Sequence, residues 1–248
     1  MTDSEVAAAI AAEAAVLLMQ IRGERGVGAA VGAFGDNAAN ELLLSALRRL
    51  RPDDAVLSEE SADDKIRLER RRVWIIDPLD GTREFSEGRE DFAVHVALTD
   101  GGVPVAAAVA LPARDEVLST VAPMGFQAGG NSPMRMVVSR SRPPQYAASM
   151  AEELGAELVT MGSAGAKAMA VVRGEVDLYV HDGGVYEWDL CAPAGVALAA
   201  GLHVSRLDGL PLRYNNPDPL LSDLLICPPH LAMTALAAAA RYRTQPAA

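Results

Sequence analysis

A buried strand that ends in two carboxylates is the feature that most constrains how this chain can fold. The string WIIDPLDGT, residues 74–82, places three hydrophobic residues directly before Asp77, and Asp80 follows three positions later. An isolated carboxylate inside a fold is strongly destabilising and takes up a proton unless a partner compensates its charge. Two explanations are open at this point. Either nearby arginines pair with these aspartates, or the aspartates coordinate a divalent cation.

The turn between the two aspartates favours the cation. Pro78 fixes its own φ angle and removes a backbone donor, so the turn is rigid. Asp77, Asp80 and the carbonyl of Leu79 can then face one point, and ligation by oxygen alone suits Mg²⁺. Histidine and cysteine are absent from this stretch, which argues against zinc. The competing interpretation is a capped turn whose aspartates accept hydrogen bonds from helix N-termini.

Gly81 and Thr82 add a second element to the same motif. Glycine lets a ligand approach the backbone closely. If Thr82 begins a helical turn, the free amides of both residues form an anion site. One short string therefore supplies carboxylates for a metal and amides for a phosphate. This combination favours a metal and phosphate site over a capped turn.

The composition limits the classes of protein to consider. The chain has 248 residues, half of them hydrophobic, which is enough for one large domain or two closely packed ones. A net charge of -11 argues against nucleic acid and anionic membranes as partners. A bound cation can still invert the local field for an anionic small molecule. The two cysteines, Cys191 and Cys227, are interpreted as small buried hydrophobes and are compatible with a reducing cytoplasm.

The N-terminal segment predicts a helix followed by a loop. Residues 1–20 are apolar and alanine-rich, but they carry three acidic residues and no basic start. We expect a soluble amphipathic helix, since the segment is a poor signal peptide and is too interrupted to span a bilayer. Residues 22–36 contain five internal glycines and no stable period, so we expect a mobile loop. A second helix is predicted from Asn37 to near Pro52.

The hydrophobic pattern divides the chain into two halves, residues 1–130 and 131–248. Residues 91–121 alternate and turn twice, which predicts an antiparallel meander. His95 within it is interpreted as an ordinary sheet histidine. AGGNSP, residues 128–133, is a plausible linker, and strands alternate with helices after it. This pattern predicts a layered protein of the α/β or α+β class.

Three strings in this order resemble a known family: SEES at 58–61, DPLDGT at 77–82 and WD at 188–189. They are similar to motifs of the inositol monophosphatase superfamily, a group of Mg²⁺-dependent, lithium-sensitive phosphatases. The resemblance extends from about Asp36 to the last strand, and three ordered motifs are far more specific than one. It implies an α+β fold with αβαβα layers and an active site between the two halves. A homodimer is compatible with this resemblance, and so is a monomer.

The resemblance also implies a set of metal ligands. Glu59, Asp77 and the Leu79 carbonyl would hold a first Mg²⁺, and Asp77, Asp80 and Asp189 would hold a second. The glycine-rich segment described above lacks the lysine that is common in inositol phosphatases, which leaves a third Mg²⁺ open.

A second group of residues would act on the attacking water and on the phosphate. Asp36 matches the aspartate that starts the second helix in the family, and it would hydrogen-bond Thr82 so that the pair orients and deprotonates the water. Glu60 would be a neighbouring carboxylate. The amides of Gly81 and Thr82 would hold the equatorial phosphate oxygens.

The second half of the chain carries the residues that bear on the substrate. The strings GSAGAK and VSRSR resemble those of the bisphosphate nucleotidases in this superfamily. The resemblance implies that Ser163, Lys167, Arg140 and Arg142 bind the substrate, with the cations serving a second phosphate. The competing interpretations are a well-packed helix start capped by Ser163, and ordinary surface charge for the arginines.

The resemblance therefore implies a Mg²⁺-dependent phosphatase of cytoplasmic sulfate assimilation. It would use metal-activated water to remove the 3'-phosphate of a small nucleotide, 3'-phosphoadenosine 5'-phosphate, and of 3'-phosphoadenylyl sulfate. Alternatives in the same class are an inositol-1-monophosphatase and a fructose-1,6-bisphosphatase. A non-catalytic regulator that binds metal or nucleotide should have lost a ligand or Thr82, whereas this chain retains them. A structural Ca²⁺ module would need EF-hand spacing, which the sequence lacks.

Overall fold

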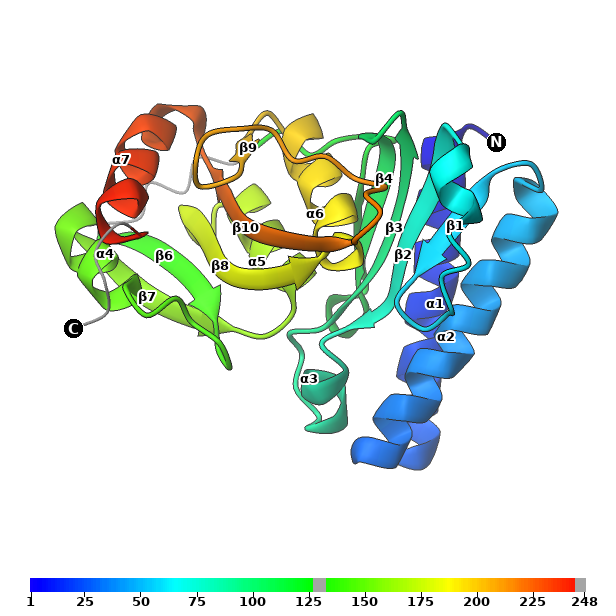
Figure 1. Cartoon of the computed structure of the whole chain (residues 1–248). Helices are drawn as coiled ribbons and strands as arrows, with labels where there is room; N and C mark the ends of the chain where they lie inside the picture. The colour runs from blue at the N-terminus through cyan, green and yellow to red at the C-terminus, as the bar shows by residue number, and fades with distance from the viewer. Residues whose placement is uncertain (127–132, 244–248) are drawn as a thin grey trace.

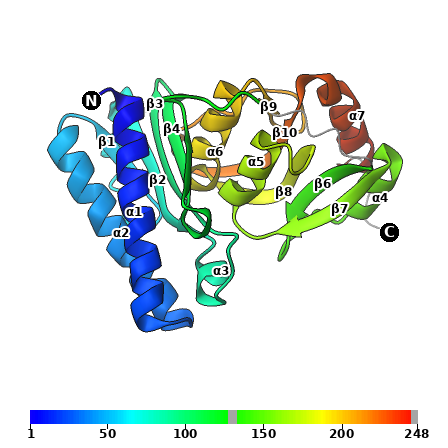
Figure 2. The same ribbon diagram turned by 180° about the vertical axis from the view of Figure 1, so that it is seen from behind.

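The computed structural model describes residues 1–126 and 133–243, which form alternating layers of helices and sheets (Figure 1). Within these residues, two helices cover the outer face of the first sheet, two lie between the sheets, and two cover the outer face of the second (Figure 2). In that order they are α1 (Asp3–Arg25), α2 (Ala29–Leu50), α5 (Ala164–Val172), α6 (Glu187–Ala199), α4 (Ala147–Leu154) and α7 (Ala232–Arg243). The predicted α+β class and αβαβα layering are confirmed.

The first sheet is five-stranded, and its strands lie in sequential order. Strands β1 and β2 are parallel, and the other pairs are antiparallel, so the predicted meander is confirmed. The strands are β1 (Ala55–Ser58), β2 (Arg72–Asp80), β3 (Ala93–Asp100), β4 (Val103–Leu111) and β5 (Glu116–Ser119). The short helix α3 (Thr82–Ser86) follows β2 directly.

The second sheet has the order β7-β6-β8-β10-β9. Strand β6 is parallel to β7 and to β8, whereas β10 is antiparallel to its two neighbours. The strands are β6 (Met134–Ser139), β7 (Ala156–Met161), β8 (Leu178–Tyr186), β9 (His203–Ser205) and β10 (Leu220–Cys227). Short 3-10 helices are η1 (Ile66–Glu69), η2 (Pro112–Arg114) and η3 (Pro229–Leu231). The predicted linker at 128–133 lies, except for Pro133, outside the described residues.

Strand β2 shows why the sequence before the acidic motif is continuously hydrophobic. Successive side chains of a strand point to opposite faces. Trp74 and Ile76 pack with α1 and α2, whereas Ile75 packs with residues of α5 and α6. Because helices cover both faces, alternation with polar residues is not needed. The strand therefore carries Asp77 and Asp80 at its end into the protein interior.

The prediction of a mobile loop at 22–36 is wrong. Helix α1 continues to Arg25 and α2 begins at Ala29, so the break between them is short. The glycines of α2 serve close packing instead: a Cβ on Gly32 would lie 2.1 Å from Ser86 Oγ, and one on Gly35 would lie 3.2 Å from a methyl carbon of Leu18. Small residues thus let α2 lie directly against α3 and α1.

The expectation that the first helix is too interrupted to span a bilayer is also wrong. By length and composition, α1 is long and apolar enough to cross a membrane. In the structure, its buried residues, which include Val6, Ile10 and Leu18, pack against the first sheet and α2. A core helix accounts for this apolar composition, because its buried face is covered by other elements of the fold.

Candidate active site

An irregularity in β2 turns Asp77 and Asp80 to the same side of the sheet. Residues three apart in a regular strand point to opposite faces. Asp77 pairs with His95 and Asp80 pairs with Ala93, so β2 takes three steps where β3 takes two. The extra residue makes a β-bulge, which redirects the side chains that follow it. Pro78 lies within this bulge.

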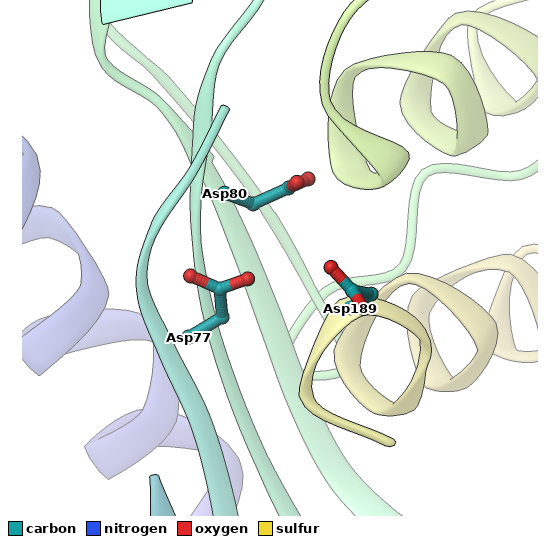
Figure 3. Close-up of side chains that lie close together, drawn as sticks. All are labelled: Asp77, Asp80 and Asp189. Atoms are coloured by element: carbon teal, nitrogen blue, oxygen red, sulfur yellow. The ribbon is translucent and has the colours of Figure 1, made fainter. Parts of the chain in front are cut away.

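Asp189 reaches the same space from the first turn of α6. The carboxylates of Asp77, Asp80 and Asp189 offer ligand oxygens that all lie within 4.8 Å of one another. Figure 3 shows the three side chains projecting from the end of β2 and the start of α6 toward a common space. Glu59, in the turn after β1, lines the same cavity. Acidic residues from segments far apart in the chain thus meet at one place.

Asp77 shows most directly that this cluster fits a cation. Its side chain is buried, Oδ1 accepts a hydrogen bond from the Leu79 amide at 3.0 Å, and Oδ2 has no hydrogen-bond partner among the described residues. His95 Nδ1 is 4.0 Å from Oδ2, and no arginine of the described chain pairs with Asp77. Burial, Glu59 and Asp80 raise the pKa of Asp77 well above its usual value. A divalent cation would coordinate the free oxygen and offset this charge.

Neighbouring carboxylates also raise the pKa values of Glu59 and Asp189. Loss of hydration of its carboxyl group in the cavity and the charge of Asp189 raise the pKa of Glu59 to about 8, although the residue as a whole is exposed. Burial and the charge of Asp80 raise the pKa of Asp189 to about 6, and one Asp189 oxygen accepts a hydrogen bond from the Tyr186 amide at 2.7 Å. Carboxyl groups that disfavour each other's ionisation lie close enough to share one compensating ion.

Asp80 differs from its neighbours because the fold itself supplies partners. One oxygen accepts hydrogen bonds from the Ser163 hydroxyl and from the Gly165 amide at 2.8 Å, and His95 Nε2 lies 3.2 Å away. Burial opposes ionisation, but His95, Lys167 and Ser163 together lower the pKa of Asp80 to about 2. Asp80 therefore links the acidic cluster to the start of α5.

Asp36 and Thr82 form the predicted hydrogen-bonded pair. Thr82 Oγ1 lies 3.0 Å from Asp36 Oδ2 and also 3.0 Å from the Leu79 carbonyl oxygen. The other Asp36 oxygen is buried without a hydrogen-bond partner among the described residues, and burial and Glu60 raise the pKa of Asp36 to about 7. Asp36 lies two turns inside α2 rather than at its start, because the helix begins at Ala29. Glu60 itself is exposed.

Gly81 takes the conformation that the motif requires. Its φ angle is 91°, in the left-handed region that favours glycine, and Thr82 then begins α3. A Cβ on Gly81 would lie 3.2 Å from Phe92 Cβ and 3.3 Å from the Asp91 carbonyl oxygen. The turn therefore needs glycine both for its backbone angle and for its close packing.

The predicted basic residues have unequal surroundings. Lys167 is buried, and its Nζ donates to the carbonyl oxygens of Gly162 at 2.8 Å and Ser163 at 2.6 Å; burial lowers the pKa of Lys167 to about 8. It lines the same cavity of about 280 Å³ as the carboxylates, together with Arg142. The Arg142 guanidinium has no hydrogen-bond or ion-pair partner among the described residues. Arg140 instead pairs with two carboxylates of the first half of the chain.

A model described as the inositol monophosphatase family matches residues 5–245. The chain belongs to the inositol monophosphatase family. It is 54% identical over 242 residues to the 3'-phosphoadenosine 5'-phosphate phosphatase of Mycobacterium leprae (strain TN), covering 92% of this chain and 89% of that protein. It is 32% identical over 198 residues to the 3'(2'),5'-bisphosphate nucleotidase CysQ of Escherichia coli (strain K12), covering 75% and 80%. The solved structure of Mycobacterium tuberculosis SuhB matches with 27% identity and a TM-score of 0.76, covering 96% of each chain.

The inositol monophosphatase family is metal-dependent, and the acidic cluster of this member offers the oxygen ligands for a metal. The motif strings by which sequence analysis reached the family all lie at this cluster. They did not lead to His95, which we interpreted as an ordinary sheet histidine. His95 is fully buried, and its Nδ1 lies 3.1 Å from the Trp188 carbonyl oxygen. Only the pairing of β2 with β3, which sets His95 opposite Asp77, could have indicated its place.

Two glycines of the GSAGAK string also have a role that sequence analysis missed. A Cβ on Gly165 would lie 2.1 Å from His95 Nε2, and one on Gly162 would lie 2.3 Å from Glu84 Cγ. Ser163 caps α5, since its hydroxyl oxygen accepts from the Ala166 amide at 3.0 Å. The small residues therefore bring the start of α5 into contact with the first half of this family member.

Proposed function

We propose that this chain is a Mg²⁺-dependent phosphatase that removes the 3'-phosphate of 3'-phosphoadenosine 5'-phosphate, and of 3'-phosphoadenylyl sulfate, in cytoplasmic sulfate assimilation. The observation that carries the proposal is the 54% identity, across 92% of the chain, to a 3'-phosphoadenosine 5'-phosphate phosphatase. The bisphosphate nucleotidase CysQ, a more distant relative, supports the same class of substrate. A cavity that joins clustered carboxylates to basic side chains is consistent with an anionic substrate held by a metal.

Glu59, Asp77, the Leu79 carbonyl, Asp80 and Asp189 would hold two Mg²⁺ ions, with a third left open. When bound, the cations would offset the charge of the carboxylates and stabilise the negative charge that develops on the phosphoryl group. The unpartnered Asp77 oxygen and the mutually raised pKa values support this assignment.

Asp36 and Thr82 would orient the attacking water and remove its proton. Asp36 accepts a hydrogen bond from the Thr82 hydroxyl, so a lone pair of the Thr82 oxygen is free to accept a hydrogen bond from the attacking water. As the water gives up a proton to Thr82 Oγ1, the Thr82 hydroxyl proton would pass to Asp36, and burial and Glu60 raise the pKa of Asp36 to about 7, which suits a proton acceptor near neutral pH. The neighbouring carboxylate Glu60 would contribute to that raised pKa. The water oxygen bonds to phosphorus as the bond from phosphorus to the 3'-oxygen breaks, and the 3'-oxygen takes up a proton from solvent, leaving adenosine 5'-phosphate and inorganic phosphate.

The Gly81 and Thr82 amides would hold the phosphoryl oxygens, and the basic side of the cavity would hold the rest of the substrate. Arg142 lines the cavity, and its guanidinium, which no other described residue engages, can pair with the second phosphate. Lys167 and Ser163 line the cavity as well, but the fold already engages their polar atoms. They would shape the substrate side of the site.

Phosphate release from a panel of esters tests the proposal. We expect 3'-phosphoadenosine 5'-phosphate to be hydrolysed with a far higher kcat/KM than inositol-1-phosphate or fructose-1,6-bisphosphate. The activity should disappear in chelator and return with Mg²⁺. Faster hydrolysis of inositol-1-phosphate would replace the proposed substrate, and absence of all hydrolysis in Mg²⁺ would favour a non-catalytic regulator.

A further inference from the structure

The positive charge of Arg140 is already paired with two carboxylates of the protein. Its Nη2 lies 2.6 Å from Glu84 Oε1 and 2.9 Å from Glu87 Oε2, and its Nε lies 3.2 Å from the same Glu84 oxygen. Glu84 is buried, and the Arg140 side chain is 27% exposed. Because two carboxylates surround the guanidinium, it offers little net attraction to a phosphate. Arg140 therefore differs from Arg142, whose guanidinium has no partner within residues 1–126 and 133–243.

Glu84 lies two residues after Thr82, at the point where the phosphate motif becomes helix α3. The backbone of Gly162 packs directly on its carboxyl group: a Cβ on Gly162 would lie 2.4 Å from Glu84 Cδ and 2.7 Å from Oε1. Glu84 is thus enclosed between Arg140, at the end of β6, and the segment that precedes α5. The ion pair joins the two halves of the molecule next to the site.

The segment before α5 is held by further carboxylates of the first half. The Gly162 amide donates to Asp91 Oδ2 at 2.6 Å, and the Ser163 hydroxyl donates to Asp80. Ser163 has a φ angle of 39°, which is uncommon for a residue other than glycine. Such a conformation persists only where the surroundings determine it. The position of this segment is therefore set by contacts across the two halves.

We propose that Arg140 is a positioning residue that acts through Glu84, and not a ligand of the substrate. The Glu84–Arg140 pair fixes the start of α5 against the phosphate motif. Ser163 then holds Asp80 in the metal cluster, and Lys167 keeps its place in the cavity. This inference rests on the phosphatase activity of the proposed function but not on the choice of substrate.

The test compares Arg140→Gln, Glu84→Gln and the double variant with the unmodified protein in Mg²⁺. Both single variants should lower kcat by about tenfold or more for a bisphosphate and for a monophosphate alike, because a small misplacement of reacting groups costs rate on any ester. The double variant should be no slower than the slower single variant, since both changes break one pair. Arg140→Lys keeps one ionic contact and should recover part of the rate.

Arg114→Gln is the matched control. Arg114 pairs with Glu175 at 2.9 Å, and this exposed pair also joins the two halves, at the other end of α5. The control variant should keep its kcat. Hydrogen exchange at the Gly165 and Ala166 amides, which donate to Asp80 and Ser163, gives a readout that needs no turnover. Exchange there should be faster in Arg140→Gln and Glu84→Gln and unchanged in Arg114→Gln.

Four results would overturn the inference. A higher KM for the bisphosphate alone in Arg140→Gln, with Glu84→Gln unaffected, would make Arg140 a substrate ligand. Additive losses in the double variant, or an equal loss in Arg114→Gln, would remove any specific role of the pair. Unchanged exchange at the Gly165 and Ala166 amides would do the same. If the protein hydrolyses a different ester, the proposed substrate fails, and the same comparison proceeds with that ester.

Discussion

The acidic and the basic residues in and beside the cavity differ in how far the fold itself satisfies their charges. On the acidic side, buried oxygens of Asp77 and Asp36 have no hydrogen-bond partner among the described residues. On the basic side, Arg140 is paired with Glu84, and Lys167 donates to two backbone carbonyl oxygens. The acidic side is thus incomplete without a ligand, whereas most of the basic side is already complete. Buried polar atoms that the fold leaves without a partner are therefore the ones that most need a ligand.

The largest effect should come from removing the Asp77 carboxylate, one oxygen of which has no hydrogen-bond partner among the described residues. Asp77→Asn should lower phosphatase activity by at least about a hundredfold, because the unpartnered oxygen and its charge are lost. The variant should fold at least as stably without metal, since burial and neighbouring carboxylates disfavour the ionised Asp77. Phosphate release and thermal unfolding measure the two effects.

Added Mg²⁺ supplies the control for Asp77→Asn. Mg²⁺ should raise the unfolding temperature of the unmodified protein, because an ion that binds only the folded state stabilises it. The increase should be much smaller in the variant. Retained turnover in Asp77→Asn with Mg²⁺ present would contradict the role of Asp77 in the metal site.

The second prediction concerns Gly165, whose amide donates a hydrogen bond to Asp80. Gly165→Ala would place a methyl group 2.1 Å from His95 Nε2 and 3.0 Å from Ala93 Cβ. Overpacking of this kind costs about 1–3 kcal/mol of folding free energy, and we expect kcat to fall as well. Urea unfolding measures the loss.

Gly23→Ala is the matched control for Gly165→Ala. Gly23 lies in α1 with nothing within 4 Å of a built Cβ, so alanine there should be neutral or slightly stabilising. Equal stability of Gly165→Ala and Gly23→Ala would show that α5 can move away from His95 without cost.

The third prediction sharpens the contrast between free and engaged cations. Arg142→Gln should raise the KM for 3'-phosphoadenosine 5'-phosphate by about tenfold, the effect of losing one charge-assisted contact, and should change kcat little. The KM for a monophosphate should be almost unchanged. Arg135→Gln, an exposed change on β6 away from the cavity, is the control. An equal rise of KM for both esters would assign Arg142 to the reacting phosphate.

The smallest expected effect comes from His181, a buried side chain whose protonated form the fold disfavours. His181 lines the cavity, and burial and Lys167 lower its pKa to about 4. The unfolded chain binds a proton there below about pH 6.5, whereas the folded protein does not. Stability should therefore fall as pH drops from about 6.5 toward 4, by about 1 kcal/mol between pH 7 and 5.5 from this residue. His181→Phe should show a shallower fall in urea unfolding, and an unchanged slope would contradict the pKa.

The local motif could be predicted well because its chemistry lies within a few neighbouring residues. Two aspartates around a proline, followed by Gly81 and Thr82, predict candidate metal ligands and a tight turn from neighbouring residues alone. The resemblance then added Glu59, Asp36 and Asp189, and the structure brings these residues to the same region. Local patterns predicted the strands for the same reason, since the period of the side chains is visible along the chain.

The glycines show where prediction from one sequence failed. Residues 22–36 were expected to be a loop because glycine is conformationally permissive. The structure uses Gly32 and Gly35 for close packing inside a helix, against Ser86 and Leu18. A sequence does not state whether a glycine is needed for its backbone angle or for its size, since the second depends on what lies opposite.

The sequence by itself determined the acidic motif of Asp77 and Asp80, the glycine turn that follows it and most of the succession of helices and strands, because each depends on neighbours along the chain. Only the tertiary structure decided that Arg140 pairs with Glu84 while Arg142 lines the cavity without a partner in the described part of the chain, and that His95 lies against Asp80. These outcomes depend on strand register and on packing between distant segments. Whether a charge is available for function is therefore settled by the partners that the completed fold brings to it.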